Sequence, residues 1–112
     1  MTPNNYQKEA LRTAEGMSKK YPMLINGMLG LAGESGECAD IVKKFLFQGH
    51  ALDRNHLAEE LGDVAWYLAV SAYAIGYDLD SILQMNVTKL RKRYPNGFEA
   101  ERSIHRKSEA TK

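Results

Sequence analysis

The sequence predicts an all-α fold, a four-helix bundle that packs into an oligomer. Apolar residues recur at helical spacing in four segments, and short stretches that carry proline or glycine separate these segments. The chain shows no run of alternating apolar and polar residues, the pattern typical of a half-buried strand. Helical segments joined by short loops favour a bundle.

The first helix is expected over residues 4–20. Asn4 can cap it, and apolar residues from Tyr6 to Met17 lie on one face at helical spacing. We expect Pro22 to end this helix or to force a new start, because proline disfavours the helical conformation of the residue before it.

The second helix is expected over residues 23–47 and contains four glycines. Each glycine costs about 1 kcal/mol relative to alanine inside a helix, so their presence needs a reason. Their spacing of three predicts close approach by another helix or by a substrate, and a locally broken helix is the alternative. The glycines are Gly27, Gly30, Gly33 and Gly36.

The third helix is expected over residues 53–75 and the fourth over residues 78–93, where Pro95 follows. We therefore predict one helical domain over residues 1–98. Residues 99–112 are polar and charged with little periodicity, and we expect them to form a disordered tail.

Composition narrows the class of protein. A length of 112 residues suggests one domain, and a net charge of +1 gives no overall attraction to nucleic acid or membrane, so neither is expected as a partner. The single cysteine, Cys38, excludes an intrachain disulfide. The N-terminus does not have the pattern of a signal peptide, and no apolar run is long enough for a membrane span, so we expect a cytoplasmic protein.

Two pairs of acidic residues carry the chemical signal. Glu34 and Glu37 are three residues apart on the second predicted helix, and Glu60 and Asp63 are three apart on the third, so each pair shares a helix face. Helical phase places both pairs at the edge of the apolar stripe, whereas Glu59 points the other way. Four carboxylates in one small volume repel one another unless cations lie between them. One such pair alone is usually a solvated helix face; two in one domain predict a cation site.

Oxygen ligands identify the cation as Mg²⁺, with Mn²⁺ as a substitute. Helical di-iron proteins instead combine Glu residues with Glu-x-x-His. This chain has three histidines, and none of them stands three residues after a Glu; they are His50, His56 and His105. A site of this kind suits phosphate chemistry, because the cation neutralises phosphate oxygens and lowers the pKa of a bound water.

Basic side chains for a polyphosphate are expected on the fourth helix. Lys89 and Arg93 are four residues apart and share a face, which Asn86 can join. A solvated basic end of a helix, favoured by the helix dipole, is an equally good interpretation of these residues alone.

Three stretches together resemble the MazG-like nucleoside triphosphate pyrophosphohydrolases of the all-α NTP pyrophosphatase superfamily. They are GLAGESGECAD, EELGDVAWYL and NVTKLRKRYPNGF, and they extend over roughly residues 23–98. The pattern of ExxE, a spacer and then ExxD is what carries the likeness. The ordered set of three motifs is specific, whereas ExxE alone is weak.

The resemblance implies a reaction and a set of site residues. A nucleoside triphosphate would be cleaved between its α and β phosphates, giving a monophosphate and pyrophosphate. The four acids would bind Mg²⁺. The phosphates would be bound by Lys89 and Arg93, and Asn86 would lie at the site. The catalytic candidates are Glu37, preferred as the base, and Glu60. The resemblance also implies a homo-oligomer, either a dimer or a tetramer.

Two residues are candidates to recognise the nucleobase of the substrate. Trp66 and His50 are candidates to stack on it, although a core or interface position for Trp66 is at least as good an interpretation. The alternatives are a dCTP- or dUTP-specific enzyme, a phosphoribosyl-ATP pyrophosphohydrolase, or a non-catalytic helical module that binds metal or nucleotide.

Overall fold

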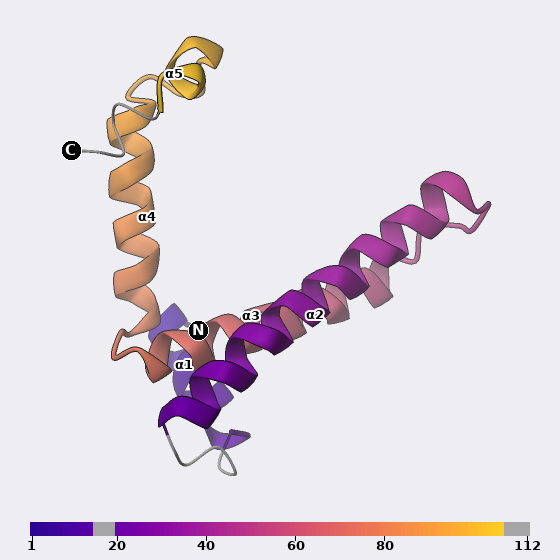
Figure 1. The fold of residues 1–112 in the computed structure, drawn as a ribbon, viewed down its shortest axis with the longest axis horizontal. Helices are drawn as coiled ribbons and strands as arrows, with labels where there is room; N and C mark the ends of the chain where they lie inside the picture. The colour runs from indigo at the N-terminus through magenta and orange to yellow at the C-terminus, as the bar shows by residue number, and fades with distance from the viewer. Residues whose placement is uncertain (15–19, 107–112) are drawn as a thin grey trace. The chain divides into compact units, whose positions relative to one another are not determined.

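The computed structural model describes residues 1–14 and 20–106, and over these residues it contains helices and no strands (Figure 1). The all-α class is therefore confirmed. The chain divides into two compact units, one over residues 1–79 and one from residue 80 onward. The helices are α1 (Pro3–Arg12), α2 (Lys20–Phe47), α3 (Arg54–Ala74), α4 (Leu79–Arg93) and α5 (Ala100–Ile104).

The end of the first helix and the start of the second differ from the prediction. α1 ends at Arg12, well before residue 20, and Thr13 forms its C-cap. The predicted position of Met17 in the apolar stripe lies outside the described residues. Pro22 neither ends a helix nor starts one, because it occupies the third position of α2. Proline is tolerated in a first turn, where the backbone N–H has no partner within the helix.

The end of α2 and both ends of α3 and of α4 lie within two residues of their predicted positions, whereas α2 begins three residues earlier than predicted. The side chain of Asp53 caps α3 by accepting a hydrogen bond of 3.0 Å from the backbone N–H of His56. Gly49 and Gly76 follow α2 and α3 with positive φ angles of 74° and 86°, the conformation that favours glycine. The short helix α5 lies in the segment expected to be a tail and was not predicted.

Helices α2 and α3 pack against each other over much of their length, as Figure 1 shows. Two of the four glycines of α2 explain how closely they approach. A Cβ atom at Gly27 would overlap the side chain of Ser71, and one at Gly30 would overlap the ring of Tyr67. The predicted close approach is thus confirmed for these two glycines. Gly33 and Gly36 meet no described atom in this way.

The core of the first unit is small and consists mostly of short side chains, with α1 packed on α3. Ala10, Ala69 and Leu79 form its centre, against which Tyr6 and Trp66 pack. Short side chains bring the helix backbones together, so the position of α1 is set by close packing as well as by apolar area.

One buried polar side chain joins α1 to the far end of α3. The side-chain amide of Gln7 donates hydrogen bonds to the carbonyls of Ala69 (3.1 Å) and Tyr77 (3.2 Å). The side-chain carbonyl of Gln7 accepts one from the backbone N–H of Leu79 (3.1 Å). Buried polar groups need such partners, so Gln7 ties α1 to the turn that follows α3.

None of the described helices contains a stretch long and apolar enough to span a membrane.

The glycine contacts predict opposite effects for two substitutions on α2. Gly30→Ala should lower the free energy of unfolding by about 1–3 kcal/mol, because its methyl group overlaps the Tyr67 ring and the helices must separate. Gly36→Ala, the control, should be neutral or stabilising by up to about 1 kcal/mol, because alanine favours the helix and no described atom is in the way. Urea unfolding followed by circular dichroism measures both. Equal effects would contradict the assigned contact.

Candidate metal centre

Three of the four predicted acids converge where α2 faces α3. Glu34 comes from α2, and Glu60 and Asp63 come from α3. One carboxylate oxygen from each of these residues lies within 4.8 Å of the others. Glu34 and Glu60 are half-buried and Asp63 is exposed, so the cluster opens to solvent on one side. The two acidic motifs, far apart in sequence, thus meet in space.

Glu37 is the fourth predicted acid, and the structure places it apart from this three-residue group. It lies almost one turn further along α2 with an exposed side chain. Its negative charge nevertheless contributes to raising the pKa of Glu34. Glu37 is therefore near the cluster, on its solvent side.

The crowding of carboxylates changes the protonation of Glu34. A side-chain hydrogen bond to Glu60, desolvation and the nearby negative charges raise the pKa of Glu34 from 4.5 to about 7. Oε2 of Glu34 is buried and has no hydrogen-bond partner among the described residues. A buried acceptor without a partner is costly, so this oxygen is a position where a cation or a proton is needed.

The residues present fit a hard divalent cation. All three convergent ligand atoms are oxygens, the donors that Mg²⁺ and Mn²⁺ prefer. The nearby thiol of Cys38 does not compete, because desolvation and the charges of the acids raise its pKa and keep it protonated. The orphaned Glu34 oxygen and the mutual repulsion of the carboxylates both favour occupation by a cation.

Two further side chains adjoin the acids, and neither was assigned to the site from the sequence. The hydroxyl of Tyr6 lies 3.5 Å from the carbonyl oxygen of Gly62, and burial together with the charge of Asp63 raises its pKa. Nε2 of His56 lies 3.4 Å from Oε1 of Glu60. The sequence carried a signal for this second contact, since His56 stands four residues before Glu60 on the same helix face.

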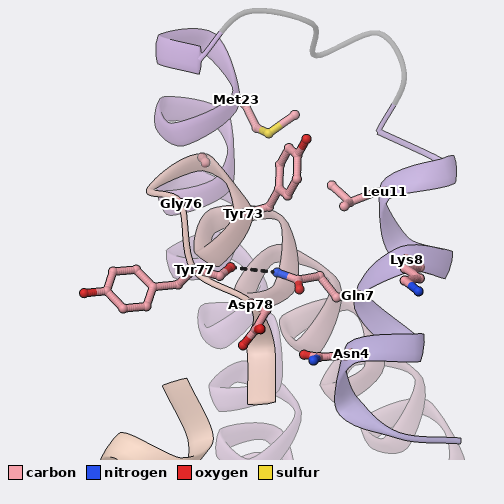
Figure 2. Close-up of a pocket in the computed structure, with 10 residues that line it drawn as sticks. Asn4, Gln7, Lys8, Leu11, Met23, Tyr73, Gly76, Tyr77 and Asp78 are labelled. Carbon is pink, nitrogen blue, oxygen red and sulfur yellow. Dashed lines mark hydrogen bonds between the residues drawn. The ribbon is translucent and has the colours of Figure 1, made fainter. Parts of the chain in front are cut away.

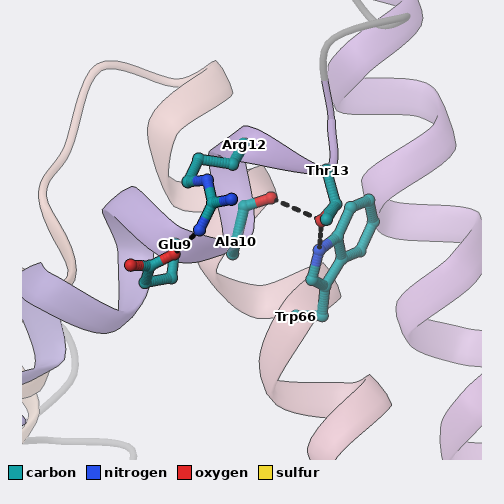
Figure 3. Close-up of polar contacts among 5 residues, drawn as sticks. All are labelled: Glu9, Ala10, Arg12, Thr13 and Trp66. Carbon is teal, nitrogen blue, oxygen red and sulfur yellow. Dashed lines mark hydrogen bonds and ion pairs between the residues drawn. The ribbon is translucent and has the colours of Figure 1, made fainter.

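Trp66, a candidate for base stacking, makes contacts typical of a structural residue. Its indole N–H donates a hydrogen bond of 2.7 Å to the hydroxyl of Thr13, which in turn donates one of 2.8 Å to the carbonyl of Ala10 (Figure 3). The ring packs against the core cluster and meets Tyr67 edge-on, with centroids 5.0 Å apart. These contacts favour the core interpretation that the sequence left open, and base stacking by Trp66 stays a prediction. His50, the other candidate, lies exposed after α2.

Three basic residues of α4 line a concave surface on this helix with a volume of about 670 Å³. Lys89 and Arg93 both contribute to it, as their spacing predicted, whereas Asn86 does not. Lys92 adds a third positive charge that the sequence interpretation did not assign. The other lining residues repeat every three or four positions along the helix and are Ser81, Gln84, Met85 and Thr88.

A larger cavity of about 860 Å³ lies in the first unit, between α1, the start of α2 and the end of α3 (Figure 2). Leu11, Met23 and Tyr73 give it an apolar wall, and Lys8 and Asp78 lie at its polar side. Asp63 and Tyr73 are ten residues apart on α3, which corresponds to about 15 Å along the helix. The cavity is therefore separate from the acidic cluster.

Comparison with known proteins finds a family model that matches most of the chain. The family model of the MazG nucleotide pyrophosphohydrolase domain matches residues 25–98. The gene 37 protein of Mycobacterium phage L5, a name that describes no activity, is 40% identical over 73 residues. That match covers 62% of this chain and 64% of the phage protein, so the chain spans less than two thirds of that relative. No solved structure matches the chain.

The raised pKa of Glu34 predicts how stability depends on pH when no metal is present. Between about pH 4.5 and 7 the folded protein keeps a proton on Glu34 that the unfolded chain, with a pKa near 4.5, has already released. Stability should therefore fall as the pH rises from about 4.5 to above 7. Thermal unfolding in EDTA at pH 5, 6, 7 and 8 measures this effect. Glu34→Gln should lose less stability over this range, and parallel profiles for the two proteins would contradict the assignment.

Proposed function

Because the chain belongs to the MazG nucleotide pyrophosphohydrolase domain family, we propose that it is a Mg²⁺-dependent hydrolase that cleaves nucleoside triphosphates between the α and β phosphates. The products are a nucleoside monophosphate and pyrophosphate, and the substrates carry ribose or deoxyribose. The observation that carries this proposal is the convergence of Glu34, Glu60 and Asp63 from two separate motifs. A cation-binding carboxylate group without histidine or thiolate suits phosphoanhydride hydrolysis.

In this proposal the acids divide into two roles. Glu34, Glu60 and Asp63 hold Mg²⁺, or Mn²⁺ in its place, with Glu37 as a fourth ligand from the solvent side. When bound, the cation neutralises charge on the phosphate oxygens and makes water easier to deprotonate. Glu37 is also our preferred base, since its exposed carboxylate can accept a proton from the attacking water. Glu60 is the second catalytic candidate.

The polyphosphate requires positive charge in addition to the cation. We assign that role to Lys89 and Arg93, with Asn86 as a hydrogen-bonding neighbour. The concave basic surface on α4 supports the first two and adds Lys92. The family match continues to residue 98 and so includes this helix, which supports treating residues 1–98 as one functional domain.

His50 and Trp66 are the candidates to stack on the nucleobase of the substrate. His50 is exposed and available for stacking, whereas Trp66 is held by Thr13. A dCTP- or dUTP-specific hydrolase and a phosphoribosyl-ATP pyrophosphohydrolase use the same cleavage chemistry and are therefore outcomes of a substrate panel.

The proposed reaction is tested with a panel of NTPs and dNTPs in Mg²⁺, with identification of the products. We expect monophosphate and pyrophosphate. Asp63→Asn should reduce turnover by more than roughly 100-fold, because removal of a ligand costs more than the 10- to 100-fold typical of a residue that supports one. Glu37→Gln should lower kcat even at saturating Mg²⁺, because an amide cannot accept the proton of the attacking water.

Glu59→Gln is the matched control for these substitutions. Glu59 is an exposed acid of the same motif that accepts a hydrogen bond of 3.0 Å from Asn55, and it lies outside the cluster, so its loss should leave turnover unchanged. Orthophosphate as a product would overturn the assigned cleavage position. Nucleotide or metal binding without turnover of any substrate would indicate the non-catalytic module instead.

We further propose that the protein is a homo-oligomer, a dimer or a tetramer. α2 exposes large apolar side chains one turn apart, with Ile25 58% and Leu29 70% exposed, and Met28 beside them is also exposed. Buried apolar area stabilises by about 25 cal/mol per Å², so a face of this kind favours association. A second copy offers the same apolar face, which is the arrangement of a two-fold symmetric contact.

The oligomer is tested by sedimentation equilibrium. The wild-type protein should have two or four times the mass of one chain. Leu29→Asp should shift it toward the monomer, because the exposed position tolerates the charge in one chain but not at an apolar contact. Asn26→Asp places the same charge at an exposed polar position of α2 and should leave the mass unchanged. A monomeric wild-type protein at micromolar concentration would contradict the proposal.

A further inference from the structure

His56 touches the metal centre without belonging to the acidic motifs. Its Nε2 atom lies 3.4 Å from Oε1 of Glu60, one turn along α3. Glu60 is only 18% exposed, whereas His56 is 51% exposed. The imidazole therefore approaches the carboxylate from the solvent side.

The backbone of His56 is held in place independently of this contact. Asp53 caps α3 by accepting a hydrogen bond from the N–H of His56, which fixes the first turn of the helix. Residues four apart on a helix lie above one another, so the capped first turn keeps His56 within reach of the Glu60 side chain, which leans back toward the start of the helix. The contact thus follows from the cap and the helix geometry.

Glu60 needs such a neighbour for an electrostatic reason. The convergent side chains beside it, Glu34 and Asp63, are both carboxylates. Glu34 shares a side-chain hydrogen bond with Glu60, and once Glu34 gives up its proton for a cation Glu60 stands beside two negative charges that repel it. An N–H donor from Nε2 of His56, 3.4 Å from Oε1, would hold the Glu60 carboxylate against that repulsion. Metal ligands are commonly oriented by a hydrogen bond of this kind.

We propose that His56 is a positioning residue that orients Glu60 for cation binding by placing an Nε2–H donor on Oε1. This inference rests on the proposed function, because it presupposes that Glu60 is a ligand. The neutral imidazole can carry its proton on Nε2, so the role does not depend on a charge on His56.

The test is Mn²⁺ affinity, measured by isothermal titration calorimetry and by electron paramagnetic resonance of free Mn²⁺. His56→Ala should weaken binding by roughly 10- to 100-fold, the usual effect of losing a residue that orients a ligand. His56→Asn should behave like alanine, because its shorter amide places a donor near the position of Nδ1. His56→Gln should stay within about threefold of wild type, because its amide reaches the position of Nε2.

Asn55→Ala is the matched control. It removes another polar pair with the same spacing, Asn55 with Glu59, at the same end of α3 but outside the cluster. It should leave Mn²⁺ affinity unchanged, and the helical circular dichroism of all variants should match that of wild type.

The outcomes separate this inference from the proposed function. Absence of Mn²⁺ binding by the wild-type protein would overturn the metal centre itself. If the wild-type protein binds Mn²⁺ and all three His56 variants bind it with wild-type affinity, only the role of His56 would be overturned. Equal loss in all three, glutamine included, would also overturn donation from Nε2.

Discussion

The close contact between α2 and α3 is the constraint on which the candidate site depends. Gly27 lies against Ser71 and Gly30 against Tyr67, so the two helices run antiparallel and these contacts set their register. This register brings Glu34 opposite Asp63 and Glu60. A larger residue at either glycine would move the two acidic motifs relative to each other, even though neither glycine touches a carboxylate. The absence of two side chains thus sets the geometry of the metal centre.

That register has an electrostatic cost that the fold itself does not remove. Three carboxylates share a half-buried space, one oxygen of Glu34 lacks a partner among the described residues, and the pKa of Glu34 rises to about 7. A group of carboxylates that holds a proton near neutral pH can exchange that proton for a cation. Of the neighbouring groups, Nε2 of His56 lies 3.4 Å from the Glu60 carboxylate, and the thiol of Cys38 stays protonated.

Much of this arrangement could be predicted from the sequence, because helical periodicity and the spacing of acids are local properties. They predicted the all-α class, the end of α2 and both ends of α3. They also predicted that Glu34 meets Glu60 and Asp63. The early end of α1 and the tolerance of Pro22 could not be predicted, because a proline three residues into a helix and one before a helix look alike in sequence. The hydrogen bond from Trp66 to Thr13 is a tertiary contact between residues 53 positions apart, which no periodicity encodes.

The three hydrogen bonds of Gln7 make α1 part of the folded unit, although the family match begins after this helix. The family match starts at residue 25, whereas Gln7 lies in α1, ahead of it. Yet this side chain satisfies two carbonyls and one N–H around the exit of α3, and Ala10 completes the core there. The part of the chain that relatives of this family share is therefore not self-sufficient here. The matched segment depends here on α1, which lies before it and supplies one side-chain amide, from Gln7, and one small apolar side chain, from Ala10.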